Sequence, residues 1–196
     1  MLKMFSNKRH ENHKWFYTSE GTLVVGGKSD EDNETVLKTF LKPGYTIMHT
    51  SAPGSPFMII QSDNPTKKDL DEAAIFTGCF SQQWKKTSGS QRISIDVFKG
   101  NQIYKKKGMK LGTFGVKGKK EEMKIKPELV VVIQHGKYRA VPKNGHEQVL
   151  AKLKPGKLSK EQASEKIAKM IMANFHLPVS KDELMGAIPS DKIDVK

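Results

Sequence analysis

Lysine is the residue type in this chain whose chemistry is most clearly marked. The 196 residues hold 34 lysines and arginines against 21 acids, a formal net charge of +13, and 31 of these cations are lysine. A lysine ammonium is a compact charge that suits phosphate, whereas the arginine fork suits bidentate recognition of base edges. The composition therefore predicts a polyanionic partner held by its backbone, although general solubility could also favour lysine.

The positive charge is concentrated in one segment. Residues 104–126 contain nine lysines and two acids, a net charge of +7, whereas residues 143–196 carry only +3. Glycines between these lysines would let backbone N–H groups approach phosphate closely, but their spacing does not match a nucleotide-binding loop. We expect one phosphate-binding patch formed by Lys105, Lys106, Lys107, Lys110, Lys117, Lys119 and Lys120.

Other reactive side chains show no catalytic spacing. The six histidines are scattered, and the single cysteine, Cys79, lies in an apolar helical pattern typical of the core. The tight acidic cluster at residues 30–34 is explained by helix capping. We therefore expect no metal, no cofactor and no catalytic residue. The alternative is an enzyme of RNA processing or modification, which would need clustered acids.

Periodicity predicts an α+β fold with a mixed, largely antiparallel sheet and two main helices. Residues 14–18 and 22–26 form a hairpin, helices begin at Ser29 and Thr66, and further strands cover 45–49, 57–61, 93–98 and 129–133. The pair 93–98 and 102–104 should form a second hairpin. On the first strand, Trp15 and Tyr17 would pack in the core or stack on unpaired bases if exposed.

The chain divides into three regions. Residues 1–13 are expected to be a flexible segment, 14–142 one domain, and 143–196 a helical extension that docks on the domain or on a partner. Within the extension, the pattern predicts a short helix over 146–153 and capped helices after Ser159 and Ser180. No apolar run spans a bilayer and no signal peptide is evident, so a cytoplasmic protein without a membrane partner is expected.

Four blocks in order resemble the NFACT RNA-binding domain (NFACT-R). The blocks are WFYTSEGTLVVGGKSDEDNE (15–34), LKPGYTIMHTSAPGSPFMII (41–60), DEAAIFTGCFSQQW (71–84) and LGTFGVKGKKEEM (111–123). Lys28 stands where arginine is frequent in this family, and Ser51 and Pro53 replace an acidic and a polar residue. The chain resembles a stand-alone family member, because it lacks the length for the other domains of long NFACT proteins.

The resemblance implies RNA binding, with tRNA, ribosomal RNA and the large ribosomal subunit as expected partners in ribosome-associated quality control. It also singles out loop residues. Asn33 and Glu34 would order the loop at Gly26 and Gly27 (the double-glycine loop) by hydrogen bonds or merely cap a helix. His49 would contact phosphate or lie in the core. The candidate nucleic-acid-binding residues outside the lysine segment are Trp15, Tyr17, Gly26, Gly27, Lys28, Asn33, Glu34, His49, Gly54 and Ser55.

The residues and the resemblance together predict a non-catalytic RNA-binding protein of the translation system. A DNA ligand stays open, because lysine–phosphate contacts hardly distinguish the two nucleic acids. A protein-interaction module, in which the C-terminal helices bind a partner and the lysines are incidental, is the other alternative.

Overall fold

The strands of the protein form two antiparallel sheets and one small ribbon. The structure is a computed structural model that describes residues 8–88, 91–143 and 148–196. The first sheet has six strands in the order β1–β2–β4–β3–β5–β8. These strands are β1 (Lys14–Tyr17), β2 (Leu23–Gly26), β3 (Thr46–Thr50), β4 (Met58–Ile60), β5 (Ile93–Lys99) and β8 (Glu121–Ile125).

The second sheet has four strands in the order β10–β9–β11–β12. They are β9 (Leu129–Gln134), β10 (Lys137–Val141), β11 (Ala151–Leu158) and β12 (Ile193–Val195). The ribbon pairs β6 (Ile103–Tyr104) with β7 (Gly115–Val116). The helices are α1 (Asp30–Phe40), α2 (Lys67–Cys79), α3 (Gln83–Lys86), α4 (Lys160–Phe175) and α5 (Lys181–Ala187).

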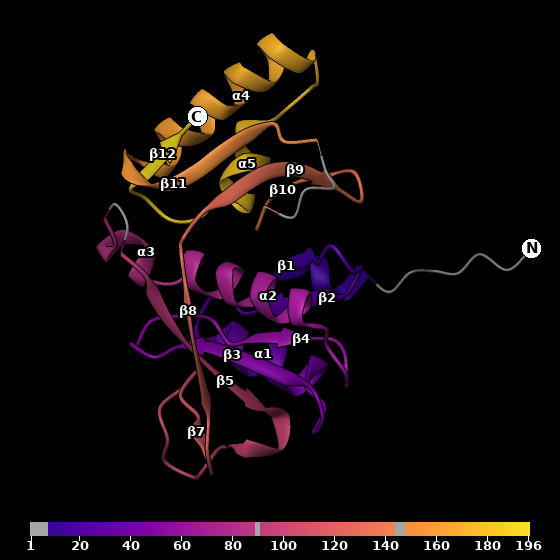
Figure 1. Ribbon diagram of the computed structural model, residues 1–196, viewed down its shortest axis with the longest axis vertical. Helices are drawn as coiled ribbons and strands as arrows, with labels where there is room; N and C mark the ends of the chain where they lie inside the picture. The colour runs from indigo at the N-terminus through magenta and orange to yellow at the C-terminus, as the bar shows by residue number, and fades with distance from the viewer. Residues whose placement is uncertain (1–7, 89–90, 144–147) are drawn as a thin grey trace, which may run out of the picture.

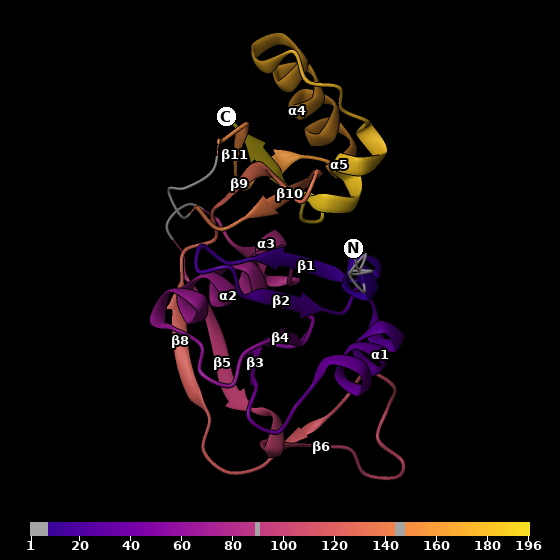
Figure 2. The same ribbon diagram turned by 90° about the vertical axis from the view of Figure 1, so that its right-hand side faces the viewer.

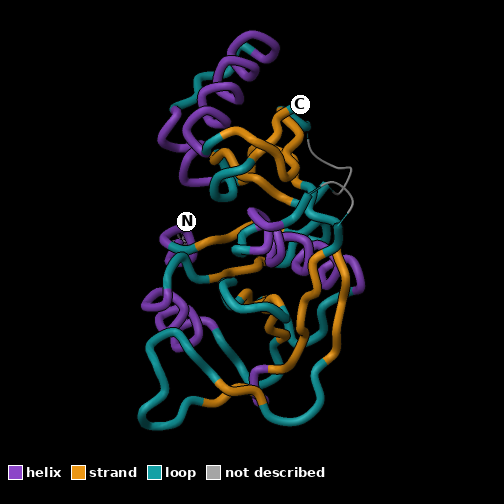
Figure 3. The backbone as a smooth tube through the Cα atoms, turned by 90° about the vertical axis from the view of Figure 1, so that its left-hand side faces the viewer, coloured by secondary structure: helices purple, strands orange, loops and turns teal. Residues whose placement is uncertain are grey.

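The elements stack in layers along the long axis of the molecule (Figure 1). Helix α2 lies between the two sheets, where Ala74 and Phe76 share a buried cluster with Val130 and Val132 of β9. Helix α1 covers the opposite face of the first sheet. Helices α4 and α5 cover the far side of the second sheet, so α4 and the β6–β7 ribbon lie at opposite ends (Figure 3).

The predicted helix starts are confirmed, because each depends on hydrogen bonds between near neighbours. The hydroxyl of Ser29 accepts the N–H of Asp32 at 3.1 Å at the start of α1. Thr66 and Ser159 form capping boxes at α2 and α4, and Ser180 caps α5. The predicted α+β class with an antiparallel sheet is confirmed as well.

The helix predicted over residues 146–153 is wrong. Ala151–Leu158 is strand β11, and residues 146 and 147 lie outside the described residues. Ala151 and Leu153 are buried while Lys152 is exposed, which is the alternation of a strand with one covered face. Pairing with β9 and β12 supplies the backbone hydrogen bonds. Region 143–196 therefore contributes strands as well as helices.

The hairpin predicted between residues 93–98 and 102–104 is also wrong. Gly100–Gln102 forms a short 3-10 helix that turns the chain away from β5, and β6 pairs with β7 instead. The edge beside β5 is taken by β8, a strand that the lysine-rich composition concealed. Its register pairs Ile93 with Ile125 and Ile95 with Met123, so Ile125 is buried in the core and Met123 packs against it, partly buried.

The predicted division at Pro142 is not a division between sheets. Strands β9 and β10 precede it, whereas β11 and β12 follow it, and all four share one sheet. In the segment 1–13, residues 8–12 form a short 3-10 helix, and His13 is hydrogen-bonded to Asp32 at 2.8 Å. Within the described ranges, every helix is too short or too polar to cross a bilayer.

Candidate nucleic-acid interface

The lysine-rich loop between β6 and β7 is docked on α1 (Figure 2). Glu34 of α1 accepts the backbone N–H of Gly112 at 3.0 Å and forms an ion pair with Lys105. The hydrogen bond from Lys105 lowers the pKa of the Glu34 carboxyl. A Cβ on Gly112 would lie 2.6 Å from the Cβ of Asp30, so only glycine permits this close approach. These contacts therefore fix the position of the loop on helix α1.

A row of rings connects this loop to the sheet. The Lys105 ammonium lies 4.6 Å from the centre of the Phe114 ring, and Phe114 packs edge-on against Phe57 at 5.5 Å. His49 also packs against Phe57, with ring centres 4.7 Å apart. We call Phe114, Phe57 and His49 the ring row.

His49 is placed in the ring row by strand β3. Its Nδ1 donates to the carbonyl oxygen of Thr50 at 2.7 Å, and burial lowers the pKa of the imidazole. Nearby, Lys120 forms an ion pair with Asp96, which also accepts the hydroxyl of Ser51 at 2.6 Å. Lys105 and Lys120 thus lie at the two ends of the ring row.

The double-glycine loop is ordered by the first turn of α1. The Asn33 side-chain oxygen accepts the N–H of Phe57 at 3.2 Å, and the N–H of Lys28 donates to Asp32 at 2.8 Å. A Cβ on Gly27 would lie 2.7 Å from the backbone nitrogen of Asn33, so this position is restricted to glycine. The hydrogen bond to the double-glycine loop thus comes from Asp32, whereas Asn33 bonds Phe57 just before β4 and Glu34 bonds the neighbouring lysine loop.

The loop between β3 and β4 lies next to the double-glycine loop. The Ser55 hydroxyl accepts the N–H of Thr50 at 2.8 Å, and the carbonyl oxygen of Gly54 accepts the N–H of Gln82 at 2.7 Å. These bonds attach the loop to β3 and to the residues after α2. The β3–β4 loop and the double-glycine loop line the same pocket. Because Ser55 precedes Phe57 by two positions, the ring row begins next to these two loops.

Four of the predicted residues are buried in the protein: Trp15, Gly26, Gly27 and Asn33. Trp15 is 1% exposed, with the Arg139 guanidinium 4.5 Å from its ring, and Gly26 is buried against Met58. Tyr17 is half-buried, with its ring 4.3 Å from that of His135. Of the two aromatic candidates, only Tyr17 keeps a partly accessible ring.

The remaining lysines of the segment are exposed. The Lys106 ammonium lies 5.4 Å from the Tyr104 ring, and the Gln102 side chain donates to the carbonyl oxygens of Lys117 and Lys119 at 2.9 and 2.8 Å. The structure thus fixes the backbone on both sides of the β6–β7 ribbon and leaves most of the charged groups to solvent, although Lys105 and Lys120 are ion-paired. The exposed members are Lys105, Lys106, Lys107, Lys110, Lys117, Lys119 and Lys120.

A pocket of about 350 Å³ opens where these loops meet the C-terminal region. Five predicted residues line it, and the lining residues that were not predicted include Lys14 of β1, Lys160 of α4 and Phe80, which directly follows α2. Nothing in the sequence marks Lys14 and Lys160 as neighbours, because only the folded chain brings β1 next to the start of α4. The predicted lining residues are Gly27, Lys28, Asn33, Gly54 and Ser55.

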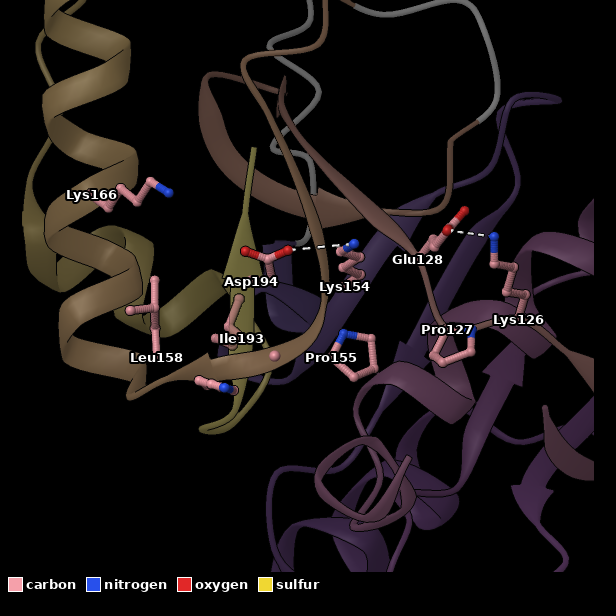
Figure 4. Close-up of a pocket in the computed structure, with 11 residues that line it drawn as sticks. Lys126, Pro127, Glu128, Lys154, Pro155, Leu158, Lys166, Ile193 and Asp194 are labelled. Carbon is pink, nitrogen blue, oxygen red and sulfur yellow. Dashed lines mark ion pairs between the residues drawn. The ribbon is translucent and has the colours of Figure 1, made fainter. Parts of the chain in front are cut away.

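A second cavity, of about 650 Å³, is also lined by lysines but is electrostatically different (Figure 4). Lys126 is paired with Glu128 at 2.8 Å and Lys154 with Asp194 at 3.5 Å. The Lys166 ammonium donates to the carbonyl oxygen of Val195 at 2.7 Å. Two of the four lysines that line this cavity, Lys126 and Lys154, are therefore already neutralised by carboxylates of the protein.

Among the described residues, no three His, Cys, Asp or Glu side chains are grouped so that they could hold a metal ion. Cys79 is buried in the cluster that contains Leu129 and Val131 of β9, and burial raises the pKa of its thiol well above the ordinary value. The thiol is therefore kept neutral and acts as a core residue.

Comparison with known proteins relates this surface to one family. Residues 12–118 match the family described as the NFACT protein RNA binding domain. The match includes the double-glycine loop, the ring row and the docked lysine loop, but it ends before Lys119 and Lys120.

Curated relatives match over shorter stretches. The ribosome quality control complex subunit NEMF of Homo sapiens is 33% identical over 79 residues, covering 38% of this chain and 7% of that protein. The Drosophila melanogaster NEMF homolog is 31% identical over 121 residues, covering 56% and 12%. The archaeal Rqc2 homolog aRqcH of Methanocaldococcus jannaschii is 29% identical over 128 residues, covering 61% and 18%. The chain spans less than a fifth of these relatives' length.

A solved structure shares the fold. The C-terminal part of the fibronectin/fibrinogen-binding protein of Streptococcus suis superposes with a TM-score of 0.53 at 19% identity, covering 59% of this chain and 45% of that one. Because the family match extends over more than half of the 196 residues and contains the assembled loops, this chain belongs to the NFACT RNA-binding domain family.

Proposed function

We propose that this protein binds RNA without catalysis, as part of translation or ribosome-associated quality control in the cytoplasm. The description of its family and the names of its relatives support RNA as the ligand class and the ribosome as the setting. Structured RNA, either tRNA or ribosomal RNA, is the proposed ligand, and the large ribosomal subunit is the proposed site of action.

The observation that carries this proposal is the docking of the lysine loop on α1. Glu34 and the ring row hold both ends of the loop, while the ammonium groups of Lys106, Lys107 and Lys110 stay exposed. A fixed backbone bearing free lysines presents charge in a set arrangement, which suits the spaced phosphates of a folded RNA. Because lysine contacts phosphate as a point charge, recognition is expected to follow RNA shape.

The acids beside this surface support a binding role. Glu34 is engaged by Lys105, Asp96 by Lys120 and Ser51, and Asp32 by His13 and the Lys28 N–H. Carboxylates that are occupied in this way are poorly placed to hold a catalytic metal ion or to exchange protons with a substrate.

Salt-dependent binding tests the proposal. Fluorescence anisotropy of labelled tRNA should give a slope of log K against log salt of about −3.5 to −4.5 if about five phosphates are contacted. Replacing Lys107 and Lys110 by glutamine should make that slope shallower by about 1.5, since each lost phosphate contact removes roughly 0.7–0.9. A slope near zero for the parent protein would contradict RNA binding through this surface.

The matched control removes the same charge elsewhere. Lys169→Gln with Lys181→Gln also lowers the net charge by two, but these residues lie on α4 and α5, at the end of the molecule opposite the lysine loop (Figure 1). Equal losses in both double variants would show that only net charge matters. Competition by unlabelled tRNA and duplex DNA distinguishes the two nucleic acids, and duplex DNA competing better would favour the DNA alternative.

A further inference from the structure

The pocket that contains Lys14 has an unusual charge arrangement. Lys14, Lys28 and Lys160 come from β1, the double-glycine loop and the start of α4, and all three line the same space of about 350 Å³. Asp30 is the one acid among its lining residues, and it lies against Gly112 of the lysine loop. In the described part of the chain, no ion pair joins any of the three lysines to a carboxylate.

The Lys14 ammonium is the most buried of these charges. It lies 5.0 Å from the centre of the Phe80 ring, which also lines the pocket. Burial, together with repulsion from Lys160, Lys28 and Arg139, lowers the pKa of Lys14 to about 8, although Asp32 opposes the change. Lys160 is affected in the same sense by burial and by Lys85, against Asp191.

An arrangement of this kind costs stability unless an anion occupies it. A buried ammonium without a counter-ion loses hydration and gains no Coulomb energy in return. Lys14, the half-buried Lys160 and the exposed Lys28 line the same space, and together they create a local positive potential that a bound anion would relieve. The paired lysines of the 650 Å³ cavity have no such deficit, because carboxylates already neutralise Lys126 and Lys154.

We infer that this pocket binds a dianionic phosphate monoester, such as the terminal phosphate of an RNA strand. A monoester has one ester attachment and up to two negative charges at neutral pH, which suits a pocket lined by three lysines and one acid. An internal phosphodiester carries one charge and must continue in two directions.

The position of the pocket suits an RNA end. Because Asp30 lies against Gly112, the pocket adjoins the docked lysine loop that is proposed to hold the strand. The Phe80 ring offers an apolar face beside the phosphate position. The inference rests on the proposed function for the source of the monoester, since a free mononucleotide would present the same phosphate.

Binding of one single-stranded RNA oligonucleotide in three forms tests the inference. The forms carry a 5′-phosphate, a 3′-phosphate, or hydroxyl groups at both ends. One phosphorylated form should bind about tenfold more tightly than the hydroxyl form, as expected for charge-assisted contacts. Adenosine 5′-monophosphate serves as the free-nucleotide competitor. Strong competition by it, with no preference among the RNA forms, would reassign the site to a free nucleotide.

Variants link the preference to the pocket. Lys14→Met and Lys160→Gln should each reduce the phosphate preference to about twofold or less, whereas Lys169→Gln should leave it unchanged. Lys160 is only half-buried and keeps the test valid if Lys14→Met disturbs folding. A preference that persists in both pocket variants would overturn the assignment.

The pH dependence gives an independent signature. The phosphate preference should grow as pH rises through about 6, where a monoester gains its second charge. It should decline above about 8, where Lys14 loses its proton, and this decline should be absent in Lys14→Met. If all forms bind equally and tightly, the pocket inference fails while RNA binding stands; if none binds, the proposed function fails.

Discussion

Lys14 is held where its own charge is unfavourable. The side chain extends from strand β1 toward Phe80 and two other lysines, and its pKa falls from 10.5 to about 8. The folded protein therefore prefers the neutral amine more strongly than the unfolded chain does. At neutral pH the ammonium form opposes folding, and this penalty disappears as pH rises between about 8 and 10.5.

Replacing Lys14 by methionine should stabilise the protein in the absence of ligand. A thioether keeps the apolar stem and removes the buried charge, so the free energy of unfolding at pH 7 should rise by about 1–3 kcal/mol. Urea unfolding followed by circular dichroism measures this change. The difference from the parent should shrink above about pH 8, because the parent then becomes neutral at this position.

Lys28→Met is the matched control for that measurement. Lys28 lines the same pocket but is exposed, so its charge is solvated and its replacement should change stability by less than about 0.5 kcal/mol. A destabilised Lys14→Met protein would show that the ammonium has a structural partner. Such a pair of results separates the cost of a buried charge from the loss of a surface lysine.

The lysine loop shows how one element is positioned by another. Helix α1 supplies Glu34, which accepts the Gly112 N–H and pairs with Lys105. The loop residue Phe114 in turn packs against Phe57 in the ring row. The loop itself has few regular backbone hydrogen bonds, so its conformation depends on these contacts with α1 and the ring row. Element packing therefore sets how the charges are displayed.

Gly112→Ala should release the loop without unfolding the protein. The added methyl group would collide with Asp30, and Gly112 has a φ of +72°, which alanine adopts with strain. We expect faster amide hydrogen exchange over residues 105–116 and about three- to tenfold weaker tRNA binding, because ordering the loop then costs binding energy. The melting temperature should change little.

The control for the loop is Gly108→Ala. Gly108 also has a positive φ, +90°, but no atom lies within 4 Å of a Cβ placed there. This variant adds comparable backbone strain without the collision with α1. Unchanged exchange in Gly112→Ala would contradict the role of the contacts with α1, while equal effects in both variants would assign the change to backbone strain alone.

At the scale of the whole molecule, strand β1 of the first sheet is hydrogen-bonded to β9 and β10 of the second sheet. The Gln134 amide of β9 donates to the carbonyl oxygen of Tyr17 at 2.8 Å, and its oxygen accepts the Tyr17 N–H at 2.9 Å. Arg139 of β10 donates to the Trp15 carbonyl oxygen at 3.0 Å and lies over the Trp15 ring. These contacts occupy the edge of β1, which would otherwise be an exposed strand edge.

Gln134→Ala should weaken the attachment of the two sheets. The Tyr17 N–H and carbonyl groups would lose their partner at a half-buried site, which costs about 1–3 kcal/mol in unfolding free energy. Thermal unfolding measures the loss, and the exposed Gln148→Ala serves as the control. Because Lys14 on β1 and Lys160 on α4 form one pocket, the phosphate preference should also fall; a preserved preference would show that the pocket holds together without this bond.

Residues 159–196 close the core of the second sheet. Ala163, Ile167 and Ile171 of α4, together with Leu184 and Ile193, are buried in the cluster that contains β9 and β11. Removing this segment would expose that cluster, so the role of the C-terminal region is better tested by surface variants. Of the two alternatives that the sequence left open, the structure shows these helices packed on the rest of the chain.

The sequence predicted the parts of the fold that depend on near neighbours. The β1–β2 hairpin and the caps at Ser29, Thr66, Ser159 and Ser180 involve residues that are close in the chain, and these predictions are confirmed. The order of the four blocks also identified the family. The binding roles of the candidate residues stay predictions, and the structure leaves Trp15 no accessible ring.

The amino-acid sequence by itself determined the charge, the family and most of the local elements, because these depend on residue type and on contacts within a few positions. Only the tertiary structure decided that Ala151–Leu158 is a strand, that β8 completes the first sheet, and that Lys14 meets Lys160. Each of these needs a partner far along the chain, and a residue's own pattern does not specify which distant partner it will contact.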